Sequence, residues 1–287
     1  MQNYTKNIHY LPSDLTEGES FFVAKTKRLQ RDPEHPSYFD AEVDFSQSRF
    51  KYPYLPLYLG EYSIPDTDNI TQNVLRMMIR KGDENAKIHL PKELLGLKSF
   101  IEDNVNYHRQ FYAINKDCFI YLTVRRSTYQ DLFYKEAFEW HIDGFQGSRI
   151  DRHIIEQDIF WCNKSPTQFL LQPMFCEGLN PSKHDINNFF HQKAKKEFIA
   201  ESKANSLYLA TPYNIHRVNP EPFDGERVFV RLNFSPVEIE DNTNTINPML
   251  EQPQYEERID VRNFLGEYRI EEEVDSGFSF PSTCVDK

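Results

Sequence analysis

The sequence predicts a mainly β protein, a sandwich or small barrel with flanking helices, and two observations support this. From about residue 108 the chain consists of short runs rich in β-branched and aromatic residues, separated by turn residues. Only one helical pattern interrupts these runs. A series of short strands with few helices favours two packed sheets or a barrel, and we expect the helices ahead of the strands to brace one sheet.

The expected strands contain Val, Ile, Phe and Tyr, either alternating with polar residues or in short apolar stretches. The most regular alternation lies near residue 230, where two arginines and a phenylalanine share one face and aliphatic residues take the other. The strand segments are RQFYAI (109–114), CFIYLTVRR (118–126), AFEWHID (137–143), IIEQDIFWCN (154–163), TQFLLQPMF (167–175), NSLYLAT (205–211), NIHRV (214–218) and ERVFVRLNF (226–234).

Three helical patterns accompany the strands. Residues 66–82 and 91–105 carry apolar side chains at intervals of three and four behind a residue that suits a helix start. Residues 185–200 carry a similar pattern among the strands. Within a single overall domain we therefore expect an N-terminal helical and irregular elaboration (1–107), a β core (108–236) and an acidic C-terminal extension (237–287) that wraps the core or carries a short helix.

Composition narrows the class of protein. Hydrophobic residues make up 39% of the 287 residues, too large a share for a disordered chain. The net charge of -11 repels nucleic-acid phosphates and anionic membranes, so we expect neither as a partner. The four cysteines form no C-x-x-C pair, and no apolar run approaches the length of a membrane span. We therefore expect a cytoplasmic protein with reduced thiols; its oligomeric state is not predicted.

A candidate metal site begins in FEWHIDG (138–144). In a strand, alternate side chains project to the same face, so His141 and Asp143 would lie side by side. An imidazole and a carboxylate do not hold a transition metal by themselves, and a second histidine would complete the arrangement of two imidazoles and one carboxylate used by non-haem iron enzymes. Alone, the pair suits a polar strand end equally well.

A later segment supplies the missing histidine and two arginines. His216 lies 75 residues after His141, and Arg227 and Arg231 follow His216 by 11 and 15 residues. The two arginines share one face of the expected strand, and arginines directed into a β core are costly to bury without an anion. Taken singly, each residue also has an ordinary structural role, such as a surface ion pair for Arg227.

In this order and spacing, His141-x-Asp143, His216, Arg227 and Arg231 resemble the Fe(II)/2-oxoglutarate-dependent oxygenases. That superfamily has an H-x-D pair, a distal histidine and, shortly after it, an arginine on the neighbouring strand. The two-arginine spacing is similar to that of the taurine-dioxygenase branch, although the gap between the histidines is shorter here. The resemblance covers roughly residues 135–235.

The resemblance implies a double-stranded β-helix, of the jelly-roll or cupin-like kind, as the catalytic core. It implies that His141, Asp143 and His216 are the catalytic iron ligands, with 2-oxoglutarate and dioxygen completing the coordination. Arg227 would bind the distal carboxylate of 2-oxoglutarate through its planar guanidinium. Arg231 would help to hold that cosubstrate or an anionic substrate.

The implied reaction converts 2-oxoglutarate to succinate and CO2 and hydroxylates, desaturates or cyclises an unactivated C–H bond. A small molecule is the expected substrate and a protein side chain the other class. Asp143 favours hydroxylation over halogenation, since halogenating relatives leave that position open for chloride.

Two further interpretations remain open at this point. The loop after the ligand pair places Gln146, Arg149 and Arg152 within reach of substrate or cosubstrate, although turn and surface roles suit them equally. The alternative function is a cupin-like protein that binds a metal or ligand without oxidising anything. In that case the long terminal regions, residues 1–107 and 237–287, would serve as an interaction surface.

Overall fold

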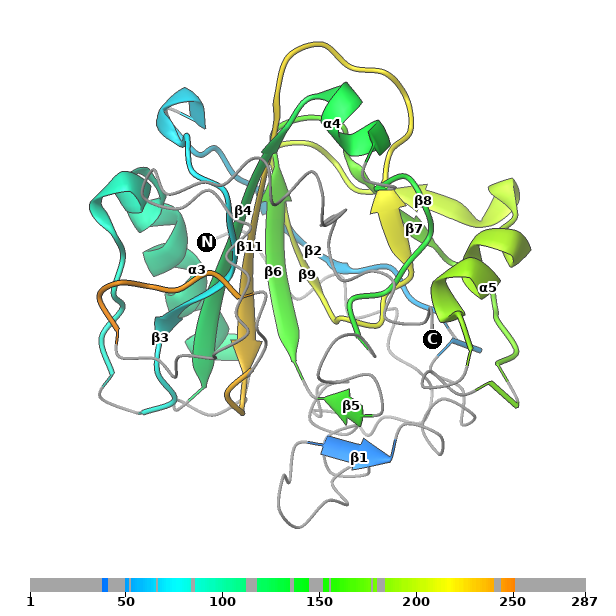
Figure 1. Cartoon of the computed structure of the whole chain (residues 1–287), viewed down its shortest axis with the longest axis horizontal. Coiled ribbons are helices and arrows are strands. Elements are labelled where there is room, and N and C mark those ends of the chain that lie inside the picture. The colour runs from blue at the N-terminus through cyan, green and yellow to red at the C-terminus, as the bar shows by residue number, and fades with distance from the viewer. Residues whose placement is uncertain are drawn as a thin grey trace.

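The computed structural model (Figure 1) is mainly antiparallel β structure with few helices, as predicted, and its core is of the jelly-roll kind. Two sheets of six and three strands face each other, and helices flank them. The structure describes residues 38–40, 50–51, 53–65, 67–83, 86–111, 118–134, 137–144, 152–154, 156–176, 178–179, 184–239 and 244–250.

The larger sheet has six antiparallel strands in the order β2-β9-β6-β11-β4-β3. The long strand β11 lies inside it, paired with β4 along its whole length and with β6 along most of it. The bounds are β2 (Leu57–Glu61), β3 (Val74–Arg80), β4 (Phe119–Ser127), β6 (Gln157–Cys162), β9 (Ser206–Ala210) and β11 (Arg227–Ser235).

The smaller sheet has the order β10-β7-β8 and packs against the inner face of the larger one. Phe169 of β7 meets Phe160 of β6 with ring centroids 5.8 Å apart. Two further strands, β1 and β5, pair with each other and lie below both sheets in Figure 1. The bounds are β7 (Thr167–Leu170), β8 (Ile199–Glu201), β10 (His216–Val218), β1 (Tyr38–Asp40) and β5 (Arg152–Ile154).

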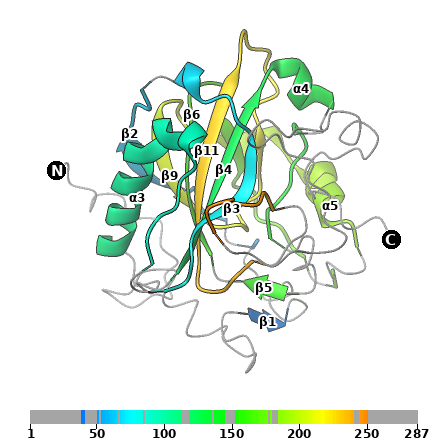
Figure 2. The same cartoon turned by 60° about the vertical axis from the view of Figure 1, so that its left-hand side comes forward.

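The helix α3 covers the outer face of the larger sheet (Figure 2). Its buried residues Phe100, Ile101 and Val105 share a core with Val228 and Val230 of β11, so the aliphatic face of that strand points outward to α3. The inner face, with the two arginines, points toward the smaller sheet. The helices are η2 (Thr67–Asn69), η3 (Lys92–Leu97), α3 (Lys98–Phe111), α4 (Tyr129–Tyr134), α5 (Ile186–Lys193) and η5 (Lys196–Phe198).

The helix predicted for residues 66–82 is wrong, because residues 74–80 form the strand β3. All seven residues of β3 are buried between β4 on one edge and residues 244–250 on the other. Leu75 exchanges hydrogen bonds with Thr245 across that second edge, at 2.8 and 2.9 Å. A strand enclosed in this way has no solvent-exposed face, and even its arginines, Arg76 and Arg80, are buried. The apolar residues around them therefore have a spacing that imitates a helix.

Two other expected boundaries shift. The helix predicted at 185–200 ends at Lys193, and the chain then turns through η5 into β8. Lys195 N donates to Gln172 Oε1 at 2.8 Å where an intrahelical bond would otherwise form. The prediction of a strand at 109–114 is wrong for residues 109–111, which belong to α3. Residues 112–117 lie outside the described part of the chain.

The larger sheet takes β2 and β3 from the region before residue 108, so the sheet begins earlier in the chain than expected. From the other end, residues 244–250 pack on β3. There Asn247 Nδ2 donates to the carbonyl oxygens of Met78 and His89, at 2.9 Å each. Residues 244–250 therefore pack against the larger sheet.

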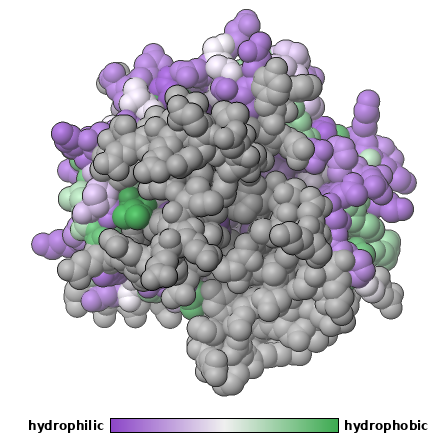
Figure 3. Space-filling view, viewed as in Figure 1, coloured by the Kyte–Doolittle hydropathy of each residue, from purple (hydrophilic) through white to green (hydrophobic). Residues whose placement is uncertain are grey.

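The described surface is mixed in character. In Figure 3 the visible described residues are mostly hydrophilic, with smaller hydrophobic areas between them. Within the described ranges no helix has the length and apolar content needed to cross a bilayer. Cys118, Cys162 and Cys176 are buried free thiols.

Candidate metal centre

His141 and His216 come together through a pair of backbone hydrogen bonds. Each residue's N–H donates to the other's carbonyl oxygen, at 3.0 and 2.9 Å, in an isolated antiparallel bridge. His216 begins β10 as predicted, whereas His141 does not lie in the expected strand 137–143. A single bridge is enough to bring together two residues that are distant in sequence, because the paired backbone fixes both Cα positions.

Asp143 lies in the bend after the bridge. The backbone N–H groups of Asp143 and Gly144 both donate to Pro212 O, at 2.8 and 2.9 Å. A Cβ at Gly144 would lie 1.9 Å from the Tyr213 ring, so only glycine permits this approach. The final G of FEWHIDG therefore helps to hold the bend that carries the carboxylate.

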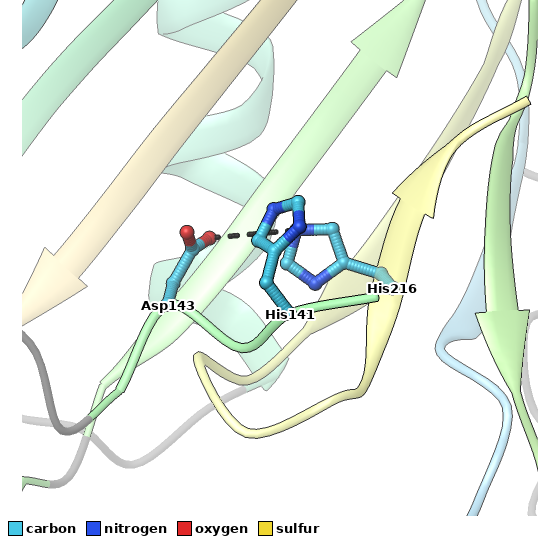
Figure 4. Close-up of side chains that lie close together, drawn as sticks. All are labelled: His141, Asp143 and His216. Atoms are coloured by element: carbon cyan, nitrogen blue, oxygen red, sulfur yellow. Dashed lines mark ion pairs between the residues drawn. The ribbon is translucent and has the colours of Figure 1, made fainter. Parts of the chain in front are cut away.

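The three side chains His141, Asp143 and His216 converge on one point (Figure 4). One nitrogen or oxygen from each lies within 4.8 Å of the others, which is the spacing of ligands around one metal ion. The imidazole centroids are 4.5 Å apart, and His216 Nε2 lies 3.8 Å from Asp143 Oδ2. Among the residues that the structure describes, this is the one group able to hold a metal.

Both imidazoles are oriented by backbone carbonyls. His141 Nδ1 lies 2.8 Å from Glu139 O, and His216 Nδ1 lies 2.8 Å from Asn214 O. A carbonyl only accepts hydrogen bonds, so each Nδ1 must carry the proton and each Nε2 is left with a lone pair. Metal-binding histidines usually have this second hydrogen bond, which fixes the tautomer.

Charge in the site suits cation binding. Burial, together with His216, lowers the pKa of His141 to about 4, so its imidazole is neutral at pH 7. Burial works to raise the pKa of Asp143, but the Arg231 guanidinium and the two histidines outweigh it and hold that pKa well below its usual range. The site therefore presents a neutral His141 imidazole and a charged Asp143 carboxylate at neutral pH.

A second layer lies behind the two histidines. The Arg217 guanidinium stacks over the Trp140 ring at 4.3 Å, and its Nε donates to Gln168 Oε1 at 2.8 Å. Trp140 precedes His141 and Arg217 follows His216, so the stack joins the two ligand segments on the side away from the ligands. Trp140 is buried behind the site. The sequence does not predict the role of Arg217, because no local pattern signals it.

Arg231 lies beside the three ligand side chains. Its Nη1 donates to Asp143 Oδ2 in an ion pair. Its Nε is buried and has no partner in the described part of the chain. The sequence predicted that Arg231 holds 2-oxoglutarate or an anionic substrate; in the structure its partner is the Asp143 carboxylate.

Arg227 lies four residues before Arg231 on the same face of β11 and is 4% exposed. Its Nε donates to Ser165 O at 2.9 Å, and its Nη2 donates to Thr167 Oγ1 at 3.3 Å. Burial lowers the pKa of this guanidinium, and no described carboxylate forms an ion pair with it. Arg227 is therefore a buried guanidinium whose partners are a carbonyl, a hydroxyl and the Cys162 thiol, none of them a carboxylate.

The other three predicted residues are not tested. Gln146 and Arg149 lie outside the described residues. Arg152 lies in β5, where the structure describes the strand but not the side chain. Their expected role near substrate stays a prediction.

Comparisons with known proteins find no match in sequence and a distant likeness in structure. No family model matches the chain, and no curated protein matches it in sequence. Among solved structures, HygX from Streptomyces hygroscopicus, with nickel and 2-oxoglutarate bound, is similar over 65% of this chain and 85% of its own. The two chains are 6% identical with a TM-score of 0.34, a likeness too slight to carry an argument about function.

Proposed function

We propose that the chain is an Fe(II)- and 2-oxoglutarate-dependent oxygenase that hydroxylates, desaturates or cyclises an unactivated C–H bond of a small molecule. The observation that carries the proposal is the convergence of two carbonyl-oriented imidazoles and one carboxylate. That donor set, with coordination positions left over, is the one that non-haem Fe(II) oxygenases use.

His141, Asp143 and His216 would hold the metal through two Nε2 atoms and a carboxylate oxygen. When bound, Fe(II) supplies the redox chemistry, in which dioxygen and 2-oxoglutarate give succinate, CO2 and an oxidised substrate. A carboxylate has two oxygens, so Asp143 can keep its hydrogen bond from Arg231 while it binds a cation. Arg231 thus orients the Asp143 carboxylate. The other role expected for Arg231, binding 2-oxoglutarate or an anionic substrate, stays a prediction.

The second support comes from Arg227. The 2-oxoglutarate distal carboxylate needs a buried cation with donors in one plane, and Arg227 with the Thr167 hydroxyl offers that set. Its lack of an ion pair with any described carboxylate fits a site reserved for an incoming anion. The apolar surroundings, which include Phe229 under the guanidinium at 5.0 Å, strengthen such a pair by excluding water.

The test is succinate release by the full chain. We expect conversion of 2-oxoglutarate to succinate that requires both Fe(II) and dioxygen, and that falls to background in His141→Ala and Asp143→Ala with the fold retained. His191→Ala is the matched control, because His191 is exposed on α5. Wild-type protein that neither binds 2-oxoglutarate in the presence of Fe(II) nor converts it, even without a substrate, would rule the proposal out.

A further inference from the structure

Two buried polar side chains next to Arg231 have hydrogen-bonding capacity that the proposed oxidation does not use. Asp158 of β6 is 3% exposed and Asn233 of β11 is 5% exposed. The two residues lie directly opposite each other in the sheet. Asn233 follows Arg231 by two residues, so both side chains lie on the inner face of the sheet.

Asp158 is a carboxylate with few partners. Asn233 Nδ2 donates to its Oδ1 at 2.9 Å and also to Glu156 Oε2 at 2.8 Å, and no described cation forms an ion pair with Asp158. Burial raises the pKa of Asp158 to about 7; Arg231 opposes this rise, and the Glu156 and Asp143 carboxylates add to it. A carboxylate can accept about four hydrogen bonds, so this one is under-supplied with donors.

Asn233 has an unused acceptor. Its Oδ1 is buried and has no hydrogen-bond partner in the described structure. Exchanging the amide oxygen and nitrogen would point the oxygen at both carboxylates, so the hydrogen-bond network dictates the present orientation. A buried acceptor without a donor destabilises the fold and is rare in native structures.

The Asp158 carboxylate and Asn233 Oδ1 both lack a hydrogen-bond donor, and the carboxylate also carries negative charge. We propose that Asp158 and Asn233 bind the protonated amino group of the substrate, an aliphatic amine whose oxidised carbon lies a few bonds from the nitrogen. The oxidation in this statement rests on the proposed function; the amine site itself does not. Among the described residues, the only group able to hold a metal is His141, Asp143 and His216, which does not include Asp158, Asn233 or Glu156.

The position of the amine site fits a reaction at the candidate metal centre. Arg227, Arg231 and Asn233 follow one face of β11, and a strand rises about 3.4 Å per residue. Arg227 is therefore roughly 14 Å from Arg231 along the strand, and Asn233 is roughly 7 Å beyond Arg231 on the other side. An anion at Arg227 and an ammonium at Asp158 would thus lie on opposite sides of the residue that contacts Asp143.

Calorimetric titration tests the proposal on the full chain loaded with Mn(II) and 2-oxoglutarate under argon. The probes are butylamine, 1,4-diaminobutane, L-lysine and agmatine, with 1-butanol as the uncharged counterpart. We expect at least one amine to bind where 1-butanol does not, and Asp158→Asn to weaken that binding by about 10- to 100-fold, the value of one charge-assisted hydrogen bond. Asp103→Asn is the matched control, since Asp103 is exposed on α3 and bonds to Tyr62.

A second measurement separates a ligand role from a structural one. Because Asp158 is buried with raised pKa, its charge destabilises the fold above pH 7, and Asp158→Asn should melt at a higher temperature than wild type at pH 8. Amine binding unchanged in Asp158→Asn, or no preference of any amine over 1-butanol, would each overturn the amine site. Failure of Mn(II) or 2-oxoglutarate to bind, with amine binding retained, would instead overturn only the proposed function.

Discussion

Replacement of Arg227 by methionine separates cosubstrate binding from stability. The guanidinium is buried without an ion pair among the described residues and donates to Ser165 O and Thr167 Oγ1. Methionine keeps the length and apolar stem of the side chain but removes its charge and donors. The expected result is a large loss of 2-oxoglutarate affinity with little loss of stability.

The magnitudes follow from the contacts. A bidentate pair with a carboxylate makes two charge-assisted bonds of about 1.5–3 kcal/mol each, so at the lower end its loss weakens 2-oxoglutarate binding about 100-fold. In the unliganded fold, the variant loses the hydrogen bonds to Ser165 O and Thr167 Oγ1, of about 1 kcal/mol each, and the contact with the Cys162 thiol. It is also relieved of the desolvation cost of a buried charge, which offsets part of that loss.

The assay is calorimetric titration of 2-oxoglutarate into protein loaded with Mn(II), with thermal unfolding measured alongside. Arg126→Met is the matched control. Arg126 lies on β4, donates to the carbonyl oxygens of Thr67 and Ile70 and pairs with Glu226, so its loss should lower stability and leave 2-oxoglutarate affinity intact. The reasoning is refuted if Arg227→Met unfolds several degrees lower while it binds 2-oxoglutarate as wild type does.

Three further predictions concern the surroundings of the site. Gly144→Ala forces the Tyr213 ring away from the bend and should cost about 1–3 kcal/mol of stability, with weaker Mn(II) binding in the same titration. Arg217→Ala removes the stack on Trp140 and should lower Mn(II) affinity about 10-fold; an unchanged affinity would show that the stack does not position the ligands. Burial lowers the pKa of His108 to about 4, so its contribution to stability is present above pH 6.5 and is lost as the pH falls toward 4. Thermal unfolding of His108→Gln should therefore depend less on pH over that window than wild type does.

The sequence predicts β4, β6, β7, β9, β10 and β11, because their β-branched and aromatic residues form a local pattern, whereas β8 falls at the end of the helix predicted at 185–200. In β11 the arginines and valines alternate, and the structure places them on opposite faces as expected. It does not predict β3, because that strand is covered on its second edge by residues 244–250, a contact invisible to a local pattern. Short-range periodicity therefore fails where long-range contacts bury every residue of a strand.

The same reasoning applies to the candidate site. His141, Asp143 and His216 were predicted because their residue types and spacing are specific to one kind of metal chemistry, and the structure brings them together. Asp158 and Asn233 were not predicted, since an aspartate and an asparagine in separate strands signal nothing until the register of β6 and β11 sets them opposite each other. Pairing register is a tertiary property that one sequence does not reveal.

The most direct test of the account is an anaerobic titration of the metal-free full chain with Fe(II). We expect one Fe(II) bound per chain, loss of that site in His216→Ala, and 2-oxoglutarate binding that strengthens when Fe(II) is present. Fe(II) binding that is absent from wild type, or that His216→Ala leaves unchanged, would contradict the assignment of His141, Asp143 and His216 as the metal ligands.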